Sequence, residues 1–350
     1  MTTPEPAGWT MPAETGPHER TWMAWPSTGY TLGETAAAAE EARAAWAAVA
    51  NAVAEHEPLH MLVPPHELAA ARRRLAGGIV LHETPLDDAW YRDTGPTFVV
   101  GPAGLGAVDW VFNGWGRQEW ASWEHDAVAG DVAIEVSGAH RIDSPLVNEG
   151  GGIHTDGAGT FLVTESVQLD PLRNPGWTRR QVEDELARTV GARAVIWLRR
   201  GLTRDSERFG TKGHVDIVAA FTAPGRVLVH DQRDPAHPDA RISREVMETL
   251  GAARDARGKP LEITALPAPA VLRDAEGWVD YSYVNHYVLN GAVVACAFDD
   301  PADDEARAIL ADAYPGRAVV TVDARPLFAR GGGVHCITQQ QPALPARNDA

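Results

Sequence analysis

Apolar side chains alternate along the chain between helical spacing and short unbroken runs. Residues 35–56, TAAAAEEARAAWAAVANAVAEH, place Trp46, Val49 and Val53 three or four positions apart, as on one face of a helix. The run LHMLV at 59–63 then reads as a buried strand. Further helices are predicted at 65–75, 178–191 (closed by Gly191), 243–251 and 303–316, and strands at 79–82, 192–198, 261–266 and 318–322. This alternation predicts an α/β fold.

Irregular segments between these elements resemble one another. They recur roughly every 50–70 residues, and most run from a glycine-rich or polar turn into an apolar strand with a polar residue at its mouth. The segments are WYRDTGPTFVV (90–100), GGGIHTDGAGTFLV (150–163), GTKGHVDIVAAF (211–221), YVNHYVLNGAVVACAF (283–298) and GGGVHCITQQ (331–340). Such recurrence indicates radial or stacked repetition. Five units around one axis would bring their polar mouths together at the centre.

The chain is predicted to be one globular unit. No linker or change of composition divides residues 1–350, so a single domain is expected, with 342–350, PALPARNDA, as a loose tail. No run approaches the ~18 apolar residues of a membrane helix, and the first residues lack the basic flank and apolar run of a secretion signal. Two cysteines cannot supply a disulfide framework or a structural zinc cage. We therefore expect a cytoplasmic protein without a membrane partner.

The charge balance restricts the partners. The formal net charge is −17, and the only lysines are Lys212 and Lys259. One basic cluster, RRR at 72–74, follows a helical stretch and is interpreted as a solvated helix face. Nucleic acid is not expected as a partner, because phosphate contacts need clustered basic residues. An acidic field instead favours a cationic substrate.

Cys336 is the first candidate for chemistry. It follows three glycines and a histidine in GGGVHC, where a cysteine is either a nucleophile or a small core residue. In a strand, His335 and Cys336 would point to opposite faces, so a catalytic base would have to come from elsewhere. Cys296, in VVACAF, has apolar neighbours and is interpreted as a packing residue.

His214 and Asp216, in GHVDIV, stand two positions apart and would share one face of a strand. This pair could bind a metal, act as a base beside a carboxylate, or be a hydrogen-bonded pair in the core. A binuclear metal hydrolase of guanidines would call for a denser motif such as D-x-H-x-D, which is absent, so no metal is predicted.

Two more acids stand at turns rather than on helices. Glu149 precedes three glycines in NEGGGIH, where the backbone or a ligand can approach closely. Asp93, in DDAWYRDTGP, follows Trp90 and Arg92. The alternative interpretation is that Asp93 caps its turn and Trp90 belongs to the core.

Hydrolysis of a guanidinium group would use all of these residues. Two carboxylates can hold its N–H groups in a fork, a thiolate can attack the central carbon, and a histidine can protonate the departing ammonia. Water activated by the same histidine then releases the product and the thiol. The sequence offers Cys336, His214, Asp93, Glu149 and Asp216 for these tasks. Their combination supports this chemistry more strongly than any one of them.

Several motifs of the chain resemble those of the agmatine deiminase family, within the guanidine-modifying group that includes bacterial peptidyl-arginine deiminase. The resemblance extends over nearly the whole chain, and its motifs stand in the same order. They are MPAETGPHERTWMAWP (11–26), DDAWYRDTGPTFVV (87–100), FNGWG (112–116), NEGGGIHTDGAGTFLVTE (148–165), GHVDIVAAF (213–221), SYVNHYVLNG (282–291) and GGGVHCITQQQP (331–342).

The resemblance implies a five-bladed α/β propeller (pentein) of ββαβ units. It implies that Cys336 is the nucleophile that forms an amidino-cysteine intermediate, that His214 is the general acid and base, and that Glu149 orients it. Asp93 and Asp216 would hold the guanidinium. Trp90 would form an aromatic wall. The family hydrolyses agmatine to N-carbamoylputrescine and ammonia, on the route to putrescine, without metal or organic cofactor, and a homodimer would suit it.

The sequence departs from the family pattern near the expected far end of the substrate. The segment before His214, RDSERFGTKGHVD, differs from the acidic segment expected in the family. Ile217 stands where the family pattern has an Asn, and no second glycine follows Gly116 in FNGWG. Glu14 is a candidate contact for a distal amine. Three interpretations therefore stay open: agmatine as substrate, another guanidine such as an arginine side chain or peptidyl-arginine, and a non-catalytic binding propeller.

Overall fold

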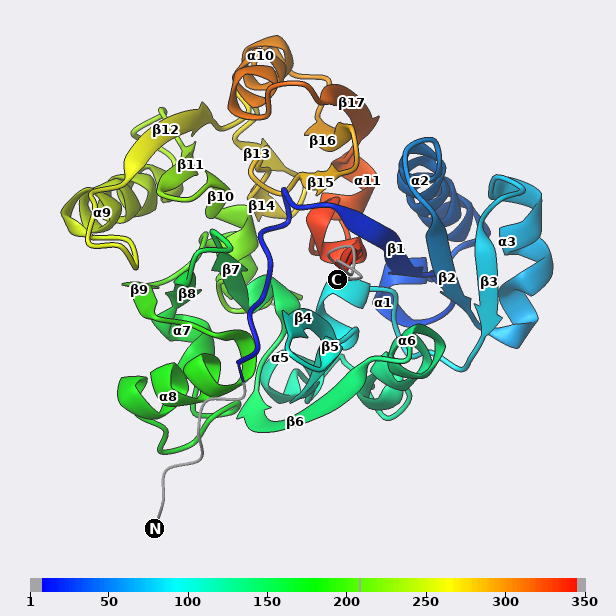
Figure 1. Ribbon diagram of the computed structural model, residues 1–350. Coiled ribbons are helices and arrows are strands. Elements are labelled where there is room, and N and C mark those ends of the chain that lie inside the picture. Colours follow the sequence, from blue (N-terminus) through cyan, green and yellow to red (C-terminus); the bar gives the residue numbers. More distant parts are fainter. Residues whose placement is uncertain (1–7, 208, 345–350) are drawn as a thin grey trace.

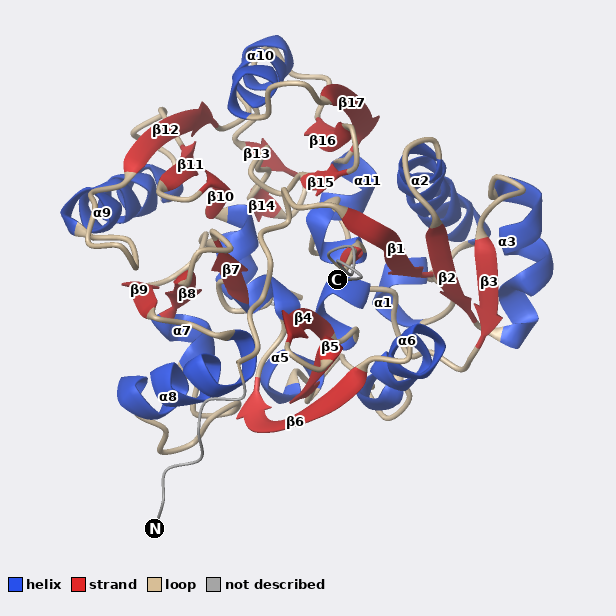
Figure 2. Ribbon diagram, in the orientation of Figure 1, coloured by secondary structure: helices blue, strands red, loops and turns tan. Residues whose placement is uncertain are grey.

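The computed structural model describes residues 8–207 and 209–344. Within these residues the strands form five sheets of three or four strands and one two-stranded hairpin. Figure 1 shows the five larger sheets spread around the middle of the molecule. Three of the longer helices, α8 (Arg179–Val190), α9 (Asp239–Ala252) and α10 (Asp303–Ala313), lie toward its periphery (Figure 2).

The five sheets share one pairing pattern. In each, a first strand pairs antiparallel with a second, and the second pairs parallel with a third. Four of these sets are β4 (Thr97–Gly101), β5 (Gly104–Val111) and β6 (His140–Val147); β7 (Ile153–Thr155), β8 (Thr160–Thr164) and β9 (Ala194–Leu198); β10 (Ala219–Ala223), β11 (Arg226–Asp231) and β12 (Glu262–Pro267); and β15 (Tyr287–Leu289), β16 (Ala292–Ala297) and β17 (Ala318–Asp323).

The fifth sheet joins the two ends of the described chain. Strand β18 (Gln339–Pro342) pairs antiparallel with β1 (His18–Ala24), which is parallel to β2 (Leu59–Val63), and β3 (Val80–Glu83) extends the sheet. The recurring glycine-rich or polar segments predicted from the sequence each run into the first strand of one sheet: β4, β7, β10, β15 or β18. Strands β13 (Arg273–Asp274) and β14 (Gly277–Trp278) form the hairpin.

Local signals explain the helix ends. Thr35 caps the Ala-rich helix α2 (Ala36–Ala54), which buries Trp46, Val49 and Val53 as predicted. In α8, Thr178 and Gln181 form a capping box. Gly191 ends the same helix in a left-handed conformation (φ 75°). The remaining α-helices are α1 (Gly29–Leu32), α3 (Leu68–Arg74), α4 (Tyr91–Thr94), α5 (Gly114–Arg117), α6 (Gly130–Ser137), α7 (Glu165–Gln168) and α11 (Arg325–Phe328).

Short 3₁₀ helices fill many of the turns. They are η1 (Pro65–Glu67), η2 (Asp126–Val128), η3 (Gly150–Gly152), η4 (Arg204–Ser206), η5 (Val215–Ile217) and η6 (His335–Ile337). The helix predicted at 65–75 is therefore divided, with a 3₁₀ turn at Pro65 before α3 begins. In the part of the chain that the structure describes, no helix has the length and apolar character needed to cross a bilayer.

The predicted tail at 342–350 begins too early. Pro342 pairs with His18 in the fifth sheet, and the Ala343 N–H donates to the carbonyl of Pro17 at 2.9 Å. Backbone hydrogen bonding to β1 and to the residue before it thus continues past the predicted boundary. Residues 345–350 lie outside the described residues.

Candidate active site

Short turns, rather than strands, carry the predicted site residues. His214 and Asp216 flank the start of η5, and β10 begins only at Ala219. Cys336 lies in η6, and β18 begins at Gln339. The expectation that these residues belong to strands is wrong. Neighbours in a 3₁₀ turn diverge by about a third of a turn instead of half, so consecutive side chains can reach one site.

Gly151, in η3, marks the point where three predicted residues meet. A Cβ atom at this position would lie 2.5 Å from His214 Nδ1, 3.0 Å from Asp93 Oδ1 and 3.1 Å from Asp216 Oδ2. The Gly151 N–H donates to Asp93 Oδ1 at 3.1 Å. Because glycine has no side chain, residues from α4, η3 and η5 can converge here. The structure therefore brings together residues far apart in the sequence.

Glu149 and His214 form a buried acid–imidazole pair. His214 Nε2 donates to Glu149 Oε2 at 3.1 Å, and Arg173 Nε donates to both Glu149 oxygens at 2.9 and 3.1 Å. Burial opposes ionisation of Glu149, but Arg173 and His214 outweigh it and lower its pKa to about 2. Burial also opposes charging of His214, but Asp93 and Glu149 raise its pKa to about 9. His214 is thus protonated at neutral pH.

Asp93 lies on the other side of the same imidazole. Its Oδ1 is 3.7 Å from His214 Nδ1, and its Oδ2 accepts from Trp115 Nε1 at 2.9 Å. Burial, despite the opposing charge of His214, raises the pKa of Asp93 to about 6, with Glu149 and Asp216 adding to the rise. A cation bound here would relieve this concentration of negative charge.

The Cys336 thiol faces the second carboxylate. Its Sγ lies 3.6 Å from Asp216 Oδ2 and 3.6 Å from Asn285 Oδ1, and Asn285 Nδ2 donates to the sulfur at 3.3 Å. Burial raises the pKa of Cys336 well above its ordinary value, and Asp216 and Asp93 raise it further. The thiol is therefore neutral at neutral pH. Cys296 is buried in β16, as the sequence predicts.

A hollow opens onto Cys336 and Asp93. Its walls include four aromatic residues, Trp90, Trp115, Trp120 and Phe209. Trp90 is held by an edge-to-face contact with Trp46 of α2 and donates its indole N–H to Thr31 Oγ1 at 3.1 Å.

Gly332 allows the Trp90 ring to lie close to the sulfur of Cys336. A Cβ atom on Gly332 would lie 2.7 Å from the Trp90 ring and 3.0 Å from Cys336 Sγ. The hollow therefore combines a thiol, a carboxylate and flat aromatic faces, which suits a planar cation.

His335 has a larger part than the sequence predicts. Its Nδ1 donates to Asp216 Oδ2 at 2.8 Å and its Nε2 donates to Glu14 Oε2 at 2.9 Å. Despite burial and the nearby Arg92, these two acids raise the pKa of His335. His335 thus connects Asp216, beside the thiol, to Glu14.

Glu14 is not a contact for a distal amine. Its Oε2 binds His335 and Arg92, and its Oε1 accepts from the Val288 N–H at 2.7 Å. It lies behind His335, outside the set of residues that line the aromatic hollow. The carboxylate is fully used by groups of the protein, so the expectation for Glu14 is wrong.

Sequence reasoning missed three residues that position the site. Asn285 and Trp115 belong to two motifs of the family resemblance, SYVNHYVLNG and FNGWG. Membership in these motifs is the sequence feature that could have identified them as site residues. Arg173 gives no sequence signal because it meets Glu149 only in the fold. No group of three or more His, Cys, Asp or Glu in residues 8–207 and 209–344 could hold a metal ion, and the expected absence of a metal stays a prediction.

Comparisons with known proteins agree on one family. A family model described as Porphyromonas-type peptidyl-arginine deiminase matches residues 10–342. An agmatine deiminase of Ectopseudomonas mendocina is 39% identical to this chain, with 98% of each covered. The chain belongs to the agmatine deiminase family. Its members are hydrolases acting on carbon–nitrogen bonds, and this chain is one of them.

Two further relatives support this membership. A Streptomyces coelicolor protein with a provisional agmatine deiminase name is 56% identical, covering 95% of this chain and 98% of its own. The solved structure of an Enterococcus faecalis agmatine deiminase superposes with a TM-score of 0.89 at 30% identity, covering 98% of both chains. The mixed α/β fold is thus shared with agmatine deiminases.

Proposed function

We propose that the protein hydrolyses agmatine to N-carbamoylputrescine and ammonia through a covalent amidino-cysteine intermediate. The single observation that carries this proposal is that the Cys336 thiol and the Asp93 carboxylate line one aromatic hollow, with the His214 imidazole 3.7 Å from Asp93 and Asp216 3.6 Å from the thiol. Membership in the agmatine deiminase family supports agmatine as the substrate.

Binding would use the two acids first. Asp93 and Asp216 would accept hydrogen bonds from the guanidinium nitrogens while Trp90 covers its face. The bound cation would neutralise the charges that raise the pKa of Cys336, so the thiol would lose its proton more readily. Substrate binding would therefore help to create the nucleophile.

The reaction would then proceed in two halves. The Cys336 thiolate attacks the central guanidinium carbon and forms a C–S bond, and the tetrahedral adduct loses one nitrogen as ammonia after His214 donates a proton to it. Neutral His214 next takes a proton from water, whose oxygen attacks the amidino carbon. In the collapse, the hydroxyl oxygen becomes the ureido carbonyl and releases its proton to solvent, and the C–S bond breaks to return the thiolate. Glu149 would hold His214 in position throughout.

Two finer points belong to the same proposal. The repeated antiparallel-then-parallel pairing of the five sheets supports a five-bladed propeller in a single domain. Both cysteines are free thiols, which suits a cytoplasmic location. The proposed product, N-carbamoylputrescine, suits a role in putrescine synthesis.

The direct test is incubation with agmatine, followed by measurement of both ammonia and N-carbamoylputrescine. We expect equal amounts of the two products, and no product from Cys336→Ser. Arginine and a peptidyl-arginine, assayed in parallel, test the other guanidines. Turnover of either in preference to agmatine would overturn the substrate assignment, and no turnover of any guanidine would favour a binding protein.

A further inference from the structure

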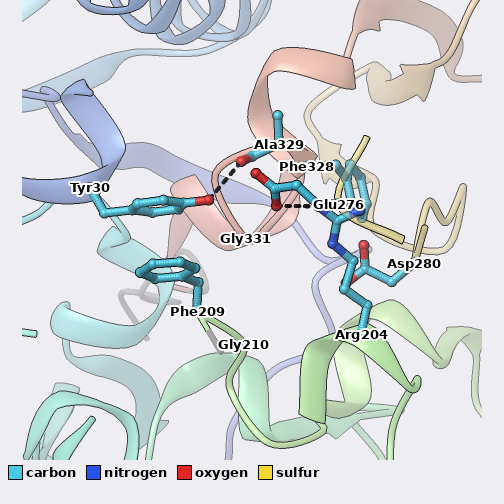
Figure 3. A pocket seen from close by; sticks show the side chains of 9 residues that line it. All are labelled: Tyr30, Arg204, Phe209, Gly210, Glu276, Asp280, Phe328, Ala329 and Gly331. Atoms are coloured by element: carbon cyan, nitrogen blue, oxygen red, sulfur yellow. Dashed lines mark hydrogen bonds and ion pairs between the residues drawn. The ribbon is translucent and has the colours of Figure 1, made fainter. Parts of the chain in front are cut away.

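A second hollow adjoins the one at Cys336 (Figure 3). The two share Phe209, Gly210 and Gly331 as lining residues. A flexible substrate whose guanidinium lies at Cys336 can therefore extend its other end past Gly331 into the second hollow. The residues that line this second space decide which far end is accepted.

Among the described residues that line the second hollow, acidic side chains outnumber basic ones. Arg204, from η4, donates through Nη1 to Asp274 at 2.6 Å and through Nη2 to Glu276 at 2.9 Å. Both acids come from the β13–β14 hairpin and its turn, and they neutralise the only Arg or Lys among the described residues that line this space. The charges on the described lining residues, Arg204, Glu276 and Asp280, therefore favour a cation over an anion.

Among the described residues, Asp280 is the acid of this hollow that has no partner residue. Its side chain lines the hollow, and the residue is only 7% exposed. Among the described residues, no other residue forms a hydrogen bond or ion pair with its carboxylate, and Figure 3 shows it pointing into the space beside Arg204. A buried carboxylate without a partner is costly, and a cationic ligand would remove that cost.

We propose that Asp280 binds the primary ammonium group at the far end of the substrate. This inference rests on the proposed function and narrows it to guanidines that carry a second positive charge. An amino-acid substrate such as arginine would bring its own carboxylate toward Asp280 and Glu276, which would repel it. Burial, with the nearby Asp205, raises the pKa of Asp280 to about 7 against the effect of Arg204, so an ammonium would also favour its ionised form.

Calorimetry with two ligands tests the assignment. The ligands are agmatine and n-butylguanidine, which has the same chain length without the amine, and the Cys336→Ser background prevents turnover. We expect Asp280→Asn to weaken agmatine binding by ~30-fold or more and to leave n-butylguanidine within about threefold. Asp304→Asn, an exposed acid of α10, is the control for loss of charge and should change neither Kd.

The outcomes separate this inference from the proposed function. Unchanged agmatine binding in Asp280→Asn, or an equal loss for both ligands, would overturn the role of Asp280 even if the parent protein hydrolyses agmatine normally. Selective loss would support it even if turnover by the parent proved to be absent. Failure of both ligands to bind the Cys336→Ser protein would overturn both proposals.

Discussion

At the scale of single residues, burial and neighbouring charges set the protonation states of the site. Burial, Asp216 and Asp93 raise the pKa of the Cys336 thiol, and burial also raises that of Asp93 to about 6. His214 carries a proton on the opposite side, because its neighbouring acids outweigh its burial. The thiol is thus neutral at neutral pH, and we expect a planar cation between the two carboxylates to change the charge states of these groups.

The thiolate of Cys336 should therefore form at lower pH when a cation is bound. In a Cys296→Ala protein, the alkylation rate of Cys336 against pH should have its midpoint above the ordinary thiol pKa of about 8.5, because burial and the two acids oppose ionisation. Millimolar acetamidine, a small planar cation, should lower that midpoint. Cys296→Ala/Cys336→Ala gives the background rate. Equal midpoints with and without acetamidine would contradict ionisation assisted by the ligand.

At the scale of elements, regular structure was predictable and the site turns were not. The helix predicted at 35–56 lies close to the observed α2, and the strand predicted at 59–63 coincides with β2. Both predictions use apolar spacing and end residues, which lie within the segment that forms the element. The turn at His335–Ile337 depends instead on contacts with distant residues, such as the bond from the His335 N–H to Asn285 Oδ1 at 3.0 Å. A strand was therefore expected where a 3₁₀ turn forms, and the role of His335 was missed.

Gly151→Ala tests the convergence of these turns. The added methyl group would press against His214, Asp93 and Asp216, so kcat/KM for agmatine should fall at least ~100-fold. Gly251→Ala in α9 is the matched control, since no atom outside its own helix lies within 4 Å of the new methyl group. That control should keep full activity and gain slightly in thermal stability. Near-normal activity in Gly151→Ala would show that the three side chains do not meet there.

At the scale of the whole molecule, the two ends of the described chain hold the Cys336 turn together. Strand β18 follows this turn directly and pairs with β1, and Arg92 of α4 donates to the carbonyl of His335 and to Gln340 Oε1. The order of the motifs let a family resemblance predict which residues share the site. It could not predict the contacts across the chain, such as Arg173 with Glu149, because no local pattern encodes them.

A double-mutant cycle measures this closure. Trp22 Nε1 of β1 donates to Gln341 Oε1 of β18 at 2.9 Å in a buried environment. Gln341→Leu should lower the free energy of unfolding by about 1–3 kcal/mol, because the indole N–H would lose its acceptor. In a Trp22→Phe background, Gln341→Leu should lower the free energy of unfolding by less than it does in the parent protein. Urea unfolding followed by circular dichroism measures both values. Additive losses would mean that the bond between the two strands contributes no stability.

The most direct test of the account is to trap the covalent intermediate on Cys336. The protein is mixed with agmatine, quenched in acid during turnover, digested and analysed by mass spectrometry, with Cys336→Ser as the control. We predict that the peptide containing Cys336 gains the mass of agmatine less ammonia, and that the peptide containing Cys296 and the Cys336→Ser protein gain nothing. Steady release of ammonia and N-carbamoylputrescine by Cys336→Ser at the parent rate would contradict the central claim.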